Sequence, residues 1–164
     1  MNRKIFETSV RFFRDNMTAR YLLRFLYKVL PMVMFVTYPA LLAYAFFNLK
    51  QDFLKLTLVP LGVFVAVTVL RIIVNEQRPY ERYGMPSVFH KDTVGKSFPS
   101  RHTASAFIIA CAFLYVDPGA GATAMVIAFL IELSRILAGA HYVHDVVAAM
   151  AMSLLAGYVF FFMV

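Results

Sequence analysis

The chain has 164 residues, of which 61% are hydrophobic and 15% are charged, and its mean hydropathy is +0.70. A soluble domain averages about 45–50% apolar and about 25% charged residues, so a soluble fold of this size cannot bury so much apolar surface. The composition excludes a disordered chain, a secreted disulfide scaffold and an ordinary cytosolic enzyme. It indicates one integral membrane domain over residues 1–164.

The net charge of +7 comes mainly from two stretches of basic residues. Seven of the sixteen Lys and Arg precede residue 29, and six more lie between Arg71 and Arg101. The first set suits a surface of anionic lipids. No nucleic-acid-binding motif accompanies the charge, so we do not expect a nucleic acid partner. The single cysteine, Cys111, excludes an internal disulfide and a thiolate metal site.

The first element is predicted over residues 1–22. Apolar residues there recur at roughly helical spacing among the basic ones. This pattern predicts an amphipathic helix that lies in the membrane interface. The alternative is a frayed tail that only assists insertion, and the periodicity favours the helix.

Five apolar stretches follow, against the roughly 20 residues that a membrane-spanning helix needs. They cover residues 25–47, 54–74, 100–116, 120–137 and 143–164, and the third and fourth are short. The expected fold is an all-α bundle of about five transmembrane helices. Residues 75–99 form a long polar connection rich in Pro, Gly, Tyr and charge, and a loop of this length in a compact domain is typically functional. We expect it to be an active-site loop.

Three polar clusters mark the ends of these stretches. Their sequences are Arg71-x6-Arg78-Pro79, Pro99-Ser100-Arg101-His102 and Ser134-Arg135-x5-His141-x3-Asp145. Successive spans alternate in direction, so all three clusters belong to the same face of the membrane. Packed helices lie about 10 Å apart, which allows the clusters to converge into one site.

The residue types in these clusters predict a phosphate site. Arginine keeps its charge and presents a planar set of donors that matches phosphate oxygens. Ser100 follows a proline at an expected helix start, where free backbone N–H groups favour an anion. The loop offers no pair of carboxylates for a magnesium ion, so we expect no metal and no other cofactor.

The two histidines predict nucleophilic catalysis. His141 and Asp145 are four residues apart and share one helix face, so the carboxylate can orient the imidazole. The other ring nitrogen of His141 is then free to attack phosphorus and form a phosphohistidine. His102, from a different helix, can protonate the departing oxygen and later take a proton from water. The arginines stabilise the charge of the transition state.

The three clusters resemble the type 2 phosphatidic acid phosphatase family, which shares its site with vanadium haloperoxidases. The family pattern is Lys-x6-Arg-Pro, then Pro-Ser-Gly-His, then Ser-Arg-x5-His-x3-Asp, and residues 71–145 match it in order and spacing. The resemblance implies a helical membrane phosphatase acting on a lipid phosphate. It implies that His141 is the nucleophile, Asp145 its partner and His102 the general acid, while the phosphate is held by Arg71, Arg78, Ser100 and Arg135.

Two positions depart from the family pattern. Arg71 stands where the family has lysine, which keeps the charge but changes the donor geometry. Arg101 stands where the family usually has glycine, and its side chain offers an additional charge for a second phosphate or a headgroup. Among phosphatidic acid, phosphatidylglycerol phosphate, a polyprenyl diphosphate and a phosphorylated glycolipid, this charge favours the polyprenyl diphosphate.

Two other functions use the same residues. The first is a vanadate-dependent oxidase, which the five apolar stretches disfavour because the related oxidases are soluble. The second is a catalytically silent membrane scaffold or lipid carrier, which the intact His102, His141 and Asp145 disfavour. The pattern does not indicate the oligomeric state.

The expected location is a cell membrane of bacterial type, crossed several times. The positive-inside rule places the N-terminal segment and the site in the cytoplasm. The family resemblance implies the opposite face for many bacterial members, with six spans. The seven N-terminal charges favour the cytoplasmic orientation.

Overall fold

The computed structural model describes residues 2–91 and 93–163, and within them the regular structure is entirely helical. Met1, Asp92 and Val164, which the predicted N-terminal segment, loop and last span include, lie outside the described residues. The elements in chain order are α1 (Arg3–Asp15), α2 (Met17–Arg24), η1 (Phe25–Val29), α3 (Leu30–Asn48), α4 (Phe53–Val74), α5 (Pro79–Arg82), α6 (Arg101–Val116), α7 (Pro118–Leu137), α8 (Val143–Gly157) and η2 (Tyr158–Met163).

Four segments of the described chain are helical, long and apolar enough to cross a membrane. They are Met17–Asn48, Phe53–Arg82, Pro118–Leu137 and Val143–Met163. The helix Arg101–Val116 is apolar but shorter, with 16 residues. The prediction of an all-helical membrane bundle is confirmed, and its helices follow the five apolar stretches closely.

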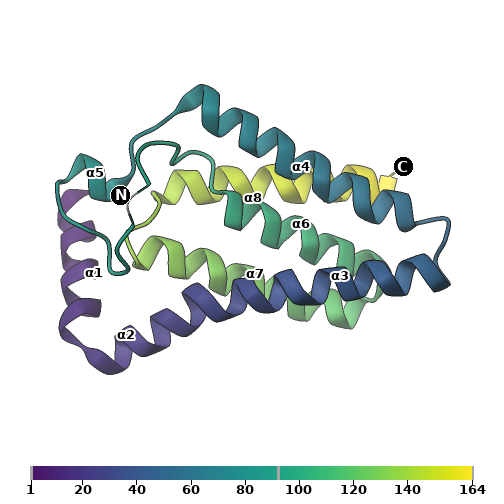
Figure 1. The fold of residues 1–164 in the computed structure, drawn as a ribbon, viewed down its shortest axis with the longest axis horizontal. Helices are drawn as coiled ribbons and strands as arrows, with labels where there is room; N and C mark the ends of the chain where they lie inside the picture. Colours follow the sequence, from purple (N-terminus) through teal and green to yellow (C-terminus); the bar gives the residue numbers. More distant parts are fainter. Residues whose placement is uncertain (1, 92, 164) are drawn as a thin grey trace.

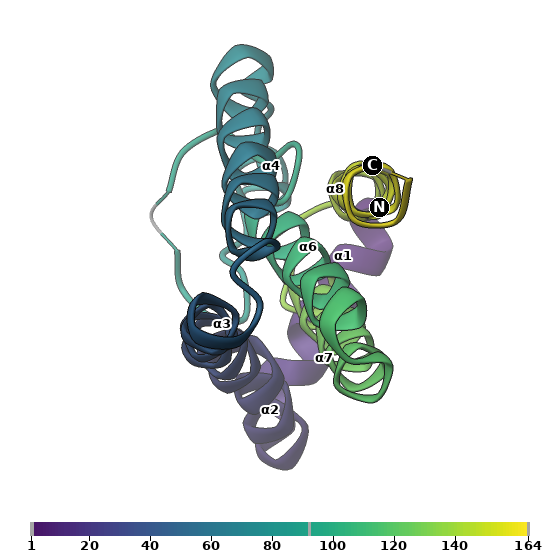
Figure 2. The ribbon, with the colours of Figure 1, turned by 90° about the vertical axis from the view of Figure 1, so that its right-hand side faces the viewer.

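The short helix α6 lies at the centre of the bundle, packed against α4, α7 and α8 (Figure 2). At about 1.5 Å per residue it is about 24 Å long, less than the roughly 30 Å of a bilayer's hydrocarbon core. Small residues bring its neighbours close. A Cβ atom on Gly121 of α7 would collide with the backbone of Leu114, and one on Gly157 of α8 would lie 2.6 Å from the Cys111 sulfur. Because other helices cover α6, it does not need the length of a lipid-exposed span.

The N-terminal segment is two helices rather than the single one expected over residues 1–22. Asn16 ends α1, and its side chain accepts a hydrogen bond from the Ala19 backbone N–H at 3.0 Å to begin α2. Helix α2 then continues through η1 into α3, whereas α1 lies across the end of the bundle (Figure 1). Phe6 and Val10 on the apolar face of α1 are fully buried and pack closely against Gly139. The segment is therefore amphipathic, as predicted, but one face of α1 is docked on the protein.

The three polar clusters gather at one end of the bundle. There α4 and α7 end and α6 and α8 begin, and the connection between α5 and α6 covers that end (Figure 1). Helix α1 is fastened to this connection because the Arg14 guanidinium donates to the Pro86 and Ser87 carbonyls at 2.9 and 3.2 Å. The fold thus places every polar motif in one region.

Candidate active site

His141 and Asp145 meet at the turn between α7 and α8. Helix α7 ends in a Schellman turn at Gly139, whose φ of +71° suits glycine, and the Ala140 N–H returns to the Arg135 carbonyl at 3.0 Å. His141 Nδ1 lies 3.2 Å from Asp145 Oδ2, and both side chains are buried. With Nδ1 donating to the carboxylate, the lone pair of His141 stands on Nε2.

Asp145 is held by more than the histidine. Its Oδ2 accepts the Tyr142 backbone N–H at 2.9 Å, which caps the start of α8, and the Ser97 hydroxyl at 2.5 Å. Ser97 was not predicted, and the only signal for it is its place three residues before Ser100. The loop is fixed to the same point because the Ser100 N–H donates to the Asp145 backbone carbonyl at 3.1 Å. The carboxylate is therefore preorganised to orient His141.

Arg78 lies beside the free nitrogen of the histidine. Its Nη1 is 3.4 Å from His141 Nε2 and 3.3 Å from the Ala140 carbonyl oxygen, and its Nε donates to the Gly95 carbonyl at 3.1 Å. The side chain is 3% exposed. A cation held this firmly beside His141, the predicted nucleophile, suits a phosphoryl group.

Arg71 and Ser100 join the loop to the helices. Arg71, in the last turn of α4, donates to the Pro99 carbonyl at 2.8 Å and lies 3.4 Å from that of Ser97. Ser100 is the fully buried residue that precedes α6, and its Oγ accepts from the Thr103 hydroxyl at 3.0 Å. The first turn of α6 leaves backbone N–H groups without intrahelical partners, an arrangement that suits an anion.

Arg135, in the last turn of α7, carries an unpartnered donor. Its guanidinium lies 3.9 Å from the centre of the Tyr27 ring, and Nη2 donates to the Tyr27 carbonyl at 3.1 Å. Its Nε is buried without a hydrogen-bond partner among the described residues. A buried unsatisfied N–H is costly unless a ligand accepts from it. Tyr27 was not predicted, because no motif connects it to Arg135.

Arg101 and His102 are the first two residues of α6. Both are exposed to an apolar groove of about 520 Å³ between α3, α4 and α6. The Arg101 guanidinium carbon lies 5.8 Å from the centre of the Phe64 ring on α4. The structure thus places Arg101 at the groove, while Arg71, Arg78 and Arg135 are buried.

The charges at the site favour a bound anion. Three guanidinium groups, those of Arg71, Arg78 and Arg135, are buried, against two buried carboxylates, those of Asp145 and Glu132. Unpaired buried charge is strongly unfavourable, so this positive excess calls for a ligand of opposite sign. Burial also lowers the pKa of His141 to about 4, although the Asp145 hydrogen bond acts in the opposite direction. The histidine is therefore neutral and able to act as a nucleophile at neutral pH.

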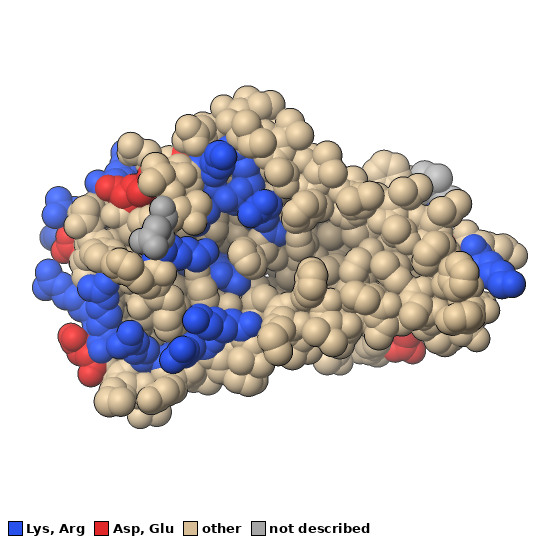
Figure 3. Space-filling model, viewed as in Figure 1, with Lys and Arg blue, Asp and Glu red and all other residues tan. Residues whose placement is uncertain are grey.

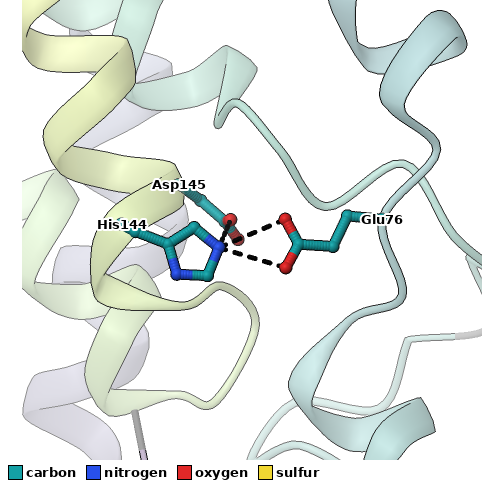
Figure 4. Close-up of side chains that lie close together, drawn as sticks. All are labelled: Glu76, His144 and Asp145. Carbon is teal, nitrogen blue, oxygen red and sulfur yellow. Dashed lines mark hydrogen bonds and ion pairs between the residues drawn. The ribbon is translucent and has the colours of Figure 1, made fainter.

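A second histidine contacts the far oxygen of Asp145 (Figure 4). His144 Nε2 lies 3.1 Å from Asp145 Oδ1 and 3.1 Å from each carboxylate oxygen of Glu76. The ligand atoms of these three residues lie close enough together to hold a metal ion. A hydrogen bond without any metal also explains the contact between Glu76 and His144, and it ties the second residue after α4 to α8. His144 and Glu76 thus support the face of Asp145 that is turned away from His141.

Comparisons with known proteins agree on one family. The family model described as "PAP2 superfamily" matches residues 52–164. The undecaprenyl-diphosphatase BcrC of Bacillus subtilis (strain 168) is 25% identical over 139 residues, which cover 79% of this chain and 72% of that protein. The region that the family model matches begins at the start of α4 and includes all three polar clusters.

Two solved structures share the fold. The crystal structure of Aquifex aeolicus LpxE is 27% identical with a TM-score of 0.65, and the match covers 85% of this chain and 92% of that one. The transmembrane PAP2-type phosphatidylglycerolphosphate phosphatase from Bacillus subtilis is 22% identical, also with a TM-score of 0.65, over 96% of this chain and 81% of that one. The second likeness concerns the fold alone.

Proposed function

Because the chain belongs to the PAP2 superfamily and is a membrane lipid phosphate phosphatase, we propose that His141 performs its chemistry through a phosphohistidine intermediate. The observation that supports this most is the buried His141–Asp145 pair, in which His141 Nε2 lies 3.4 Å from the Arg78 guanidinium. A neutral nucleophile and a phosphate-binding cation are thereby adjacent before substrate arrives.

In the first step, His141 Nε2 attacks phosphorus and forms the P–N bond while the bond from phosphorus to the lipid oxygen breaks. His102 donates a proton to that oxygen, so the lipid leaves as a neutral alcohol, or as a monophosphate when the substrate is a diphosphate. The imidazole gains positive charge, which the Asp145 carboxylate stabilises across the 3.2 Å contact to Nδ1.

In the second step, His102 accepts a proton from water, and the water oxygen attacks phosphorus. The P–N bond breaks, its electron pair returns to His141 Nε2, and inorganic phosphate is released. Arg71, Arg78, Arg135 and the N–H groups at the start of α6 hold the equatorial phosphate oxygens in both steps. Such preorganised donors account for most of the catalysis in phosphoryl transfer.

The apolar groove supports a substrate with a long hydrocarbon chain. It runs between α3, α4 and α6, is lined by side chains such as Phe35, Leu42, Leu61 and Phe64, and reaches His102 at its polar end. A chain lying in the groove enters from the lipid and brings its phosphate to the proposed general acid. We propose that the reaction needs no cofactor, because the arginines of the site provide the positive charge.

Within this class we propose a polyprenyl diphosphate as the substrate. Arg101 at the mouth of the groove adds a cation on the leaving-group side, where the inner phosphate of a diphosphate lies. The name of the Bacillus subtilis relative, undecaprenyl-diphosphatase BcrC, is consistent with a diphosphate substrate. Phosphatidic acid and phosphatidylglycerol phosphate, with single phosphomonoesters, are the competing substrates.

The experiment is a phosphate-release assay on detergent-solubilised protein with these three substrates. The proposal predicts the highest kcat/KM for the polyprenyl diphosphate and no turnover by His141→Ala. Lys50→Ala, at the opposite end of the bundle, is the control and should keep wild-type activity. Phosphate release by a folded His141→Ala variant at the wild-type rate would contradict the proposed mechanism.

A further inference from the structure

A second basic hollow lies beside the active site. It has a volume of about 560 Å³ and is formed by α2, η1 and residues 88–91 of the loop. Four of its lining residues are cations, namely Arg20, Arg24, Lys28 and Lys91, and none of its described lining residues is acidic. Basic side chains surround the hollowed surface at this end of the molecule (Figure 3).

Three of the cations form a regular row. Arg20, Arg24 and Lys28 are four residues apart on the continuous helical segment of α2 and η1, so they share one face and extend over about 12 Å. All three are exposed, and none forms an ion pair with another residue that the structure describes, whereas Arg3 and Arg11 of α1 both pair with Glu7. Like charges at this spacing repel unless an anion lies between them.

The opposite wall of the hollow connects it to the catalytic cluster. Lys91 is half-buried, and its Nζ lies 5.6 Å from the centre of the Tyr27 ring, the same ring that Arg135 contacts at 3.9 Å. Burial lowers the pKa of Lys91, and the charges of Arg135 and Arg78 lower it further. An anion in the hollow would relieve this repulsion.

We propose that this hollow is a second phosphate-binding site, separate from the catalytic one. Arginine and lysine from two facing elements, with Tyr21 and Tyr27 between them, suit a phosphate at the level of the membrane interface. The phosphate has two sources: the headgroup of an anionic lipid, or inorganic phosphate leaving the active site. The proposal rests on the proposed function only if the bound phosphate is the inorganic phosphate that leaves the active site.

The test measures binding in a His141→Ala background, where no turnover interferes. One probe is inorganic phosphate, measured by equilibrium dialysis of the detergent-solubilised protein. The other is the protein's affinity for phosphatidic acid in phosphatidylcholine bicelles. The triple variant Arg20→Gln, Arg24→Gln, Lys28→Gln is compared with Arg3→Gln, Lys4→Gln, Arg11→Gln, which removes equal charge from the same end without touching the hollow.

With free phosphate as the ligand, the parent binds two equivalents and the row variant one. With the lipid headgroup as the ligand, the row variant binds phosphatidic acid at least tenfold more weakly. In either case the α1 variant changes less than twofold, and Lys91→Gln, a single change in the other wall, weakens binding several-fold. Equal losses in both triple variants, or no loss in the row variant with either probe, would overturn the proposal.

The outcome is independent of the proposed function. If the wild-type protein hydrolyses none of the lipid phosphates but the row variant still loses binding, the function is wrong and the second site stands. A different result is that the wild-type protein hydrolyses a lipid phosphate and loses this activity in His141→Ala, while the row variant binds both probes as tightly as its parent. In that case only the second phosphate-binding site is wrong.

Discussion

At the scale of single residues, the site depends on one carboxylate with several tasks. Asp145 caps α8, accepts from Ser97 and orients His141, so each of these contacts restricts the position of the nucleophile. His141 is buried in its unprotonated form, and this affects how the free energy of unfolding depends on pH. The pKa of His141 is about 4 in the folded protein, whereas an unperturbed histidine titrates near 6.5.

The first prediction concerns stability against pH. Between about pH 6.5 and 4 the unfolded chain binds a proton at His141 that the folded protein does not, so folding stability falls as pH falls through this window. The unfolding temperature in detergent, followed by circular dichroism, should decrease from pH 7 to pH 4.5. His141→Asn should show a shallower decrease, and identical slopes for the two proteins would contradict a buried neutral histidine.

The second prediction concerns Ser97. Ser97→Ala removes the 2.5 Å hydrogen bond to Asp145, and hydrogen bonds to charged groups contribute about 1.5–3 kcal/mol, so kcat should fall about 10- to 100-fold. Ser153→Ala is the matched control, a buried serine that donates to the Ala104 carbonyl at 2.9 Å away from the site. It should cost stability without lowering kcat, and an equal loss of kcat in both variants would remove the proposed role of Ser97.

The sequence predicts part of this site for a clear reason. Fixed spacings identify Arg78, His141 and Asp145, and the structure brings these three together. Ser97 and Tyr27 follow no spacing rule, because their contacts depend on how a loop and a distant helix fold back. Arg101 shows the limit of a linear pattern, since its motif position does not reveal that its side chain faces the groove.

At the scale of elements, close packing around α6 decides whether the site is assembled. The apolar stretches predict the helices well because hydropathy over about 20 residues is a strong signal. The break at Asn16 and the docking of α1 on Gly139 were not predictable, since they depend on tertiary contact with the α7–α8 turn. The burial of α6 was likewise unpredictable from its apolar composition, which is similar to that of a lipid-facing helix.

The third prediction tests this packing with two glycines. Gly121→Ala places a methyl group against the Leu114 backbone, whereas Gly62→Ala on α4 meets nothing within 4 Å. Overpacking costs about 1–3 kcal/mol, while alanine in an open helix position gains about 0.5–1 kcal/mol over glycine. Thermal unfolding should show a lower transition temperature for Gly121→Ala and an unchanged or higher one for Gly62→Ala. The reverse order would contradict the close approach of α6 and α7.

At the scale of the whole molecule, the charges suggest an orientation. Basic residues gather at the end that holds the site, and a few more lie at the opposite end (Figure 3). Lys50 and Lys55 lie at that opposite end, in the α3–α4 turn and the first turn of α4. The positive-inside rule predicts that the site end faces the cytoplasm. Many of these cations bind a phosphate in our account, so the charges that bear on orientation alone are those of α1, such as Arg3, Lys4 and Arg11.

The fourth prediction tests this orientation by labelling cysteines in intact cells. Val94 in the loop is 78% exposed, so Val94→Cys, with Cys111 replaced by Ala, presents a thiol at the site end. An impermeant thiol reagent should label it only after lysis, and Lys50→Cys at the opposite end should be labelled in intact cells. Labelling of Val94→Cys in intact cells would place the site outside.

The central claim is that His141 carries the phosphoryl group during turnover. To measure this directly, the protein is mixed with a lipid substrate labelled at phosphorus, and the reaction is quenched rapidly without acid. Mass spectrometry of the peptides then locates the phosphate. The account predicts phosphate on His141 Nε2, stronger accumulation in His102→Ala when a substrate with a good leaving group is used, and none in His141→Ala. Phosphate on another residue, or sustained turnover by a folded His141→Ala variant, would contradict it.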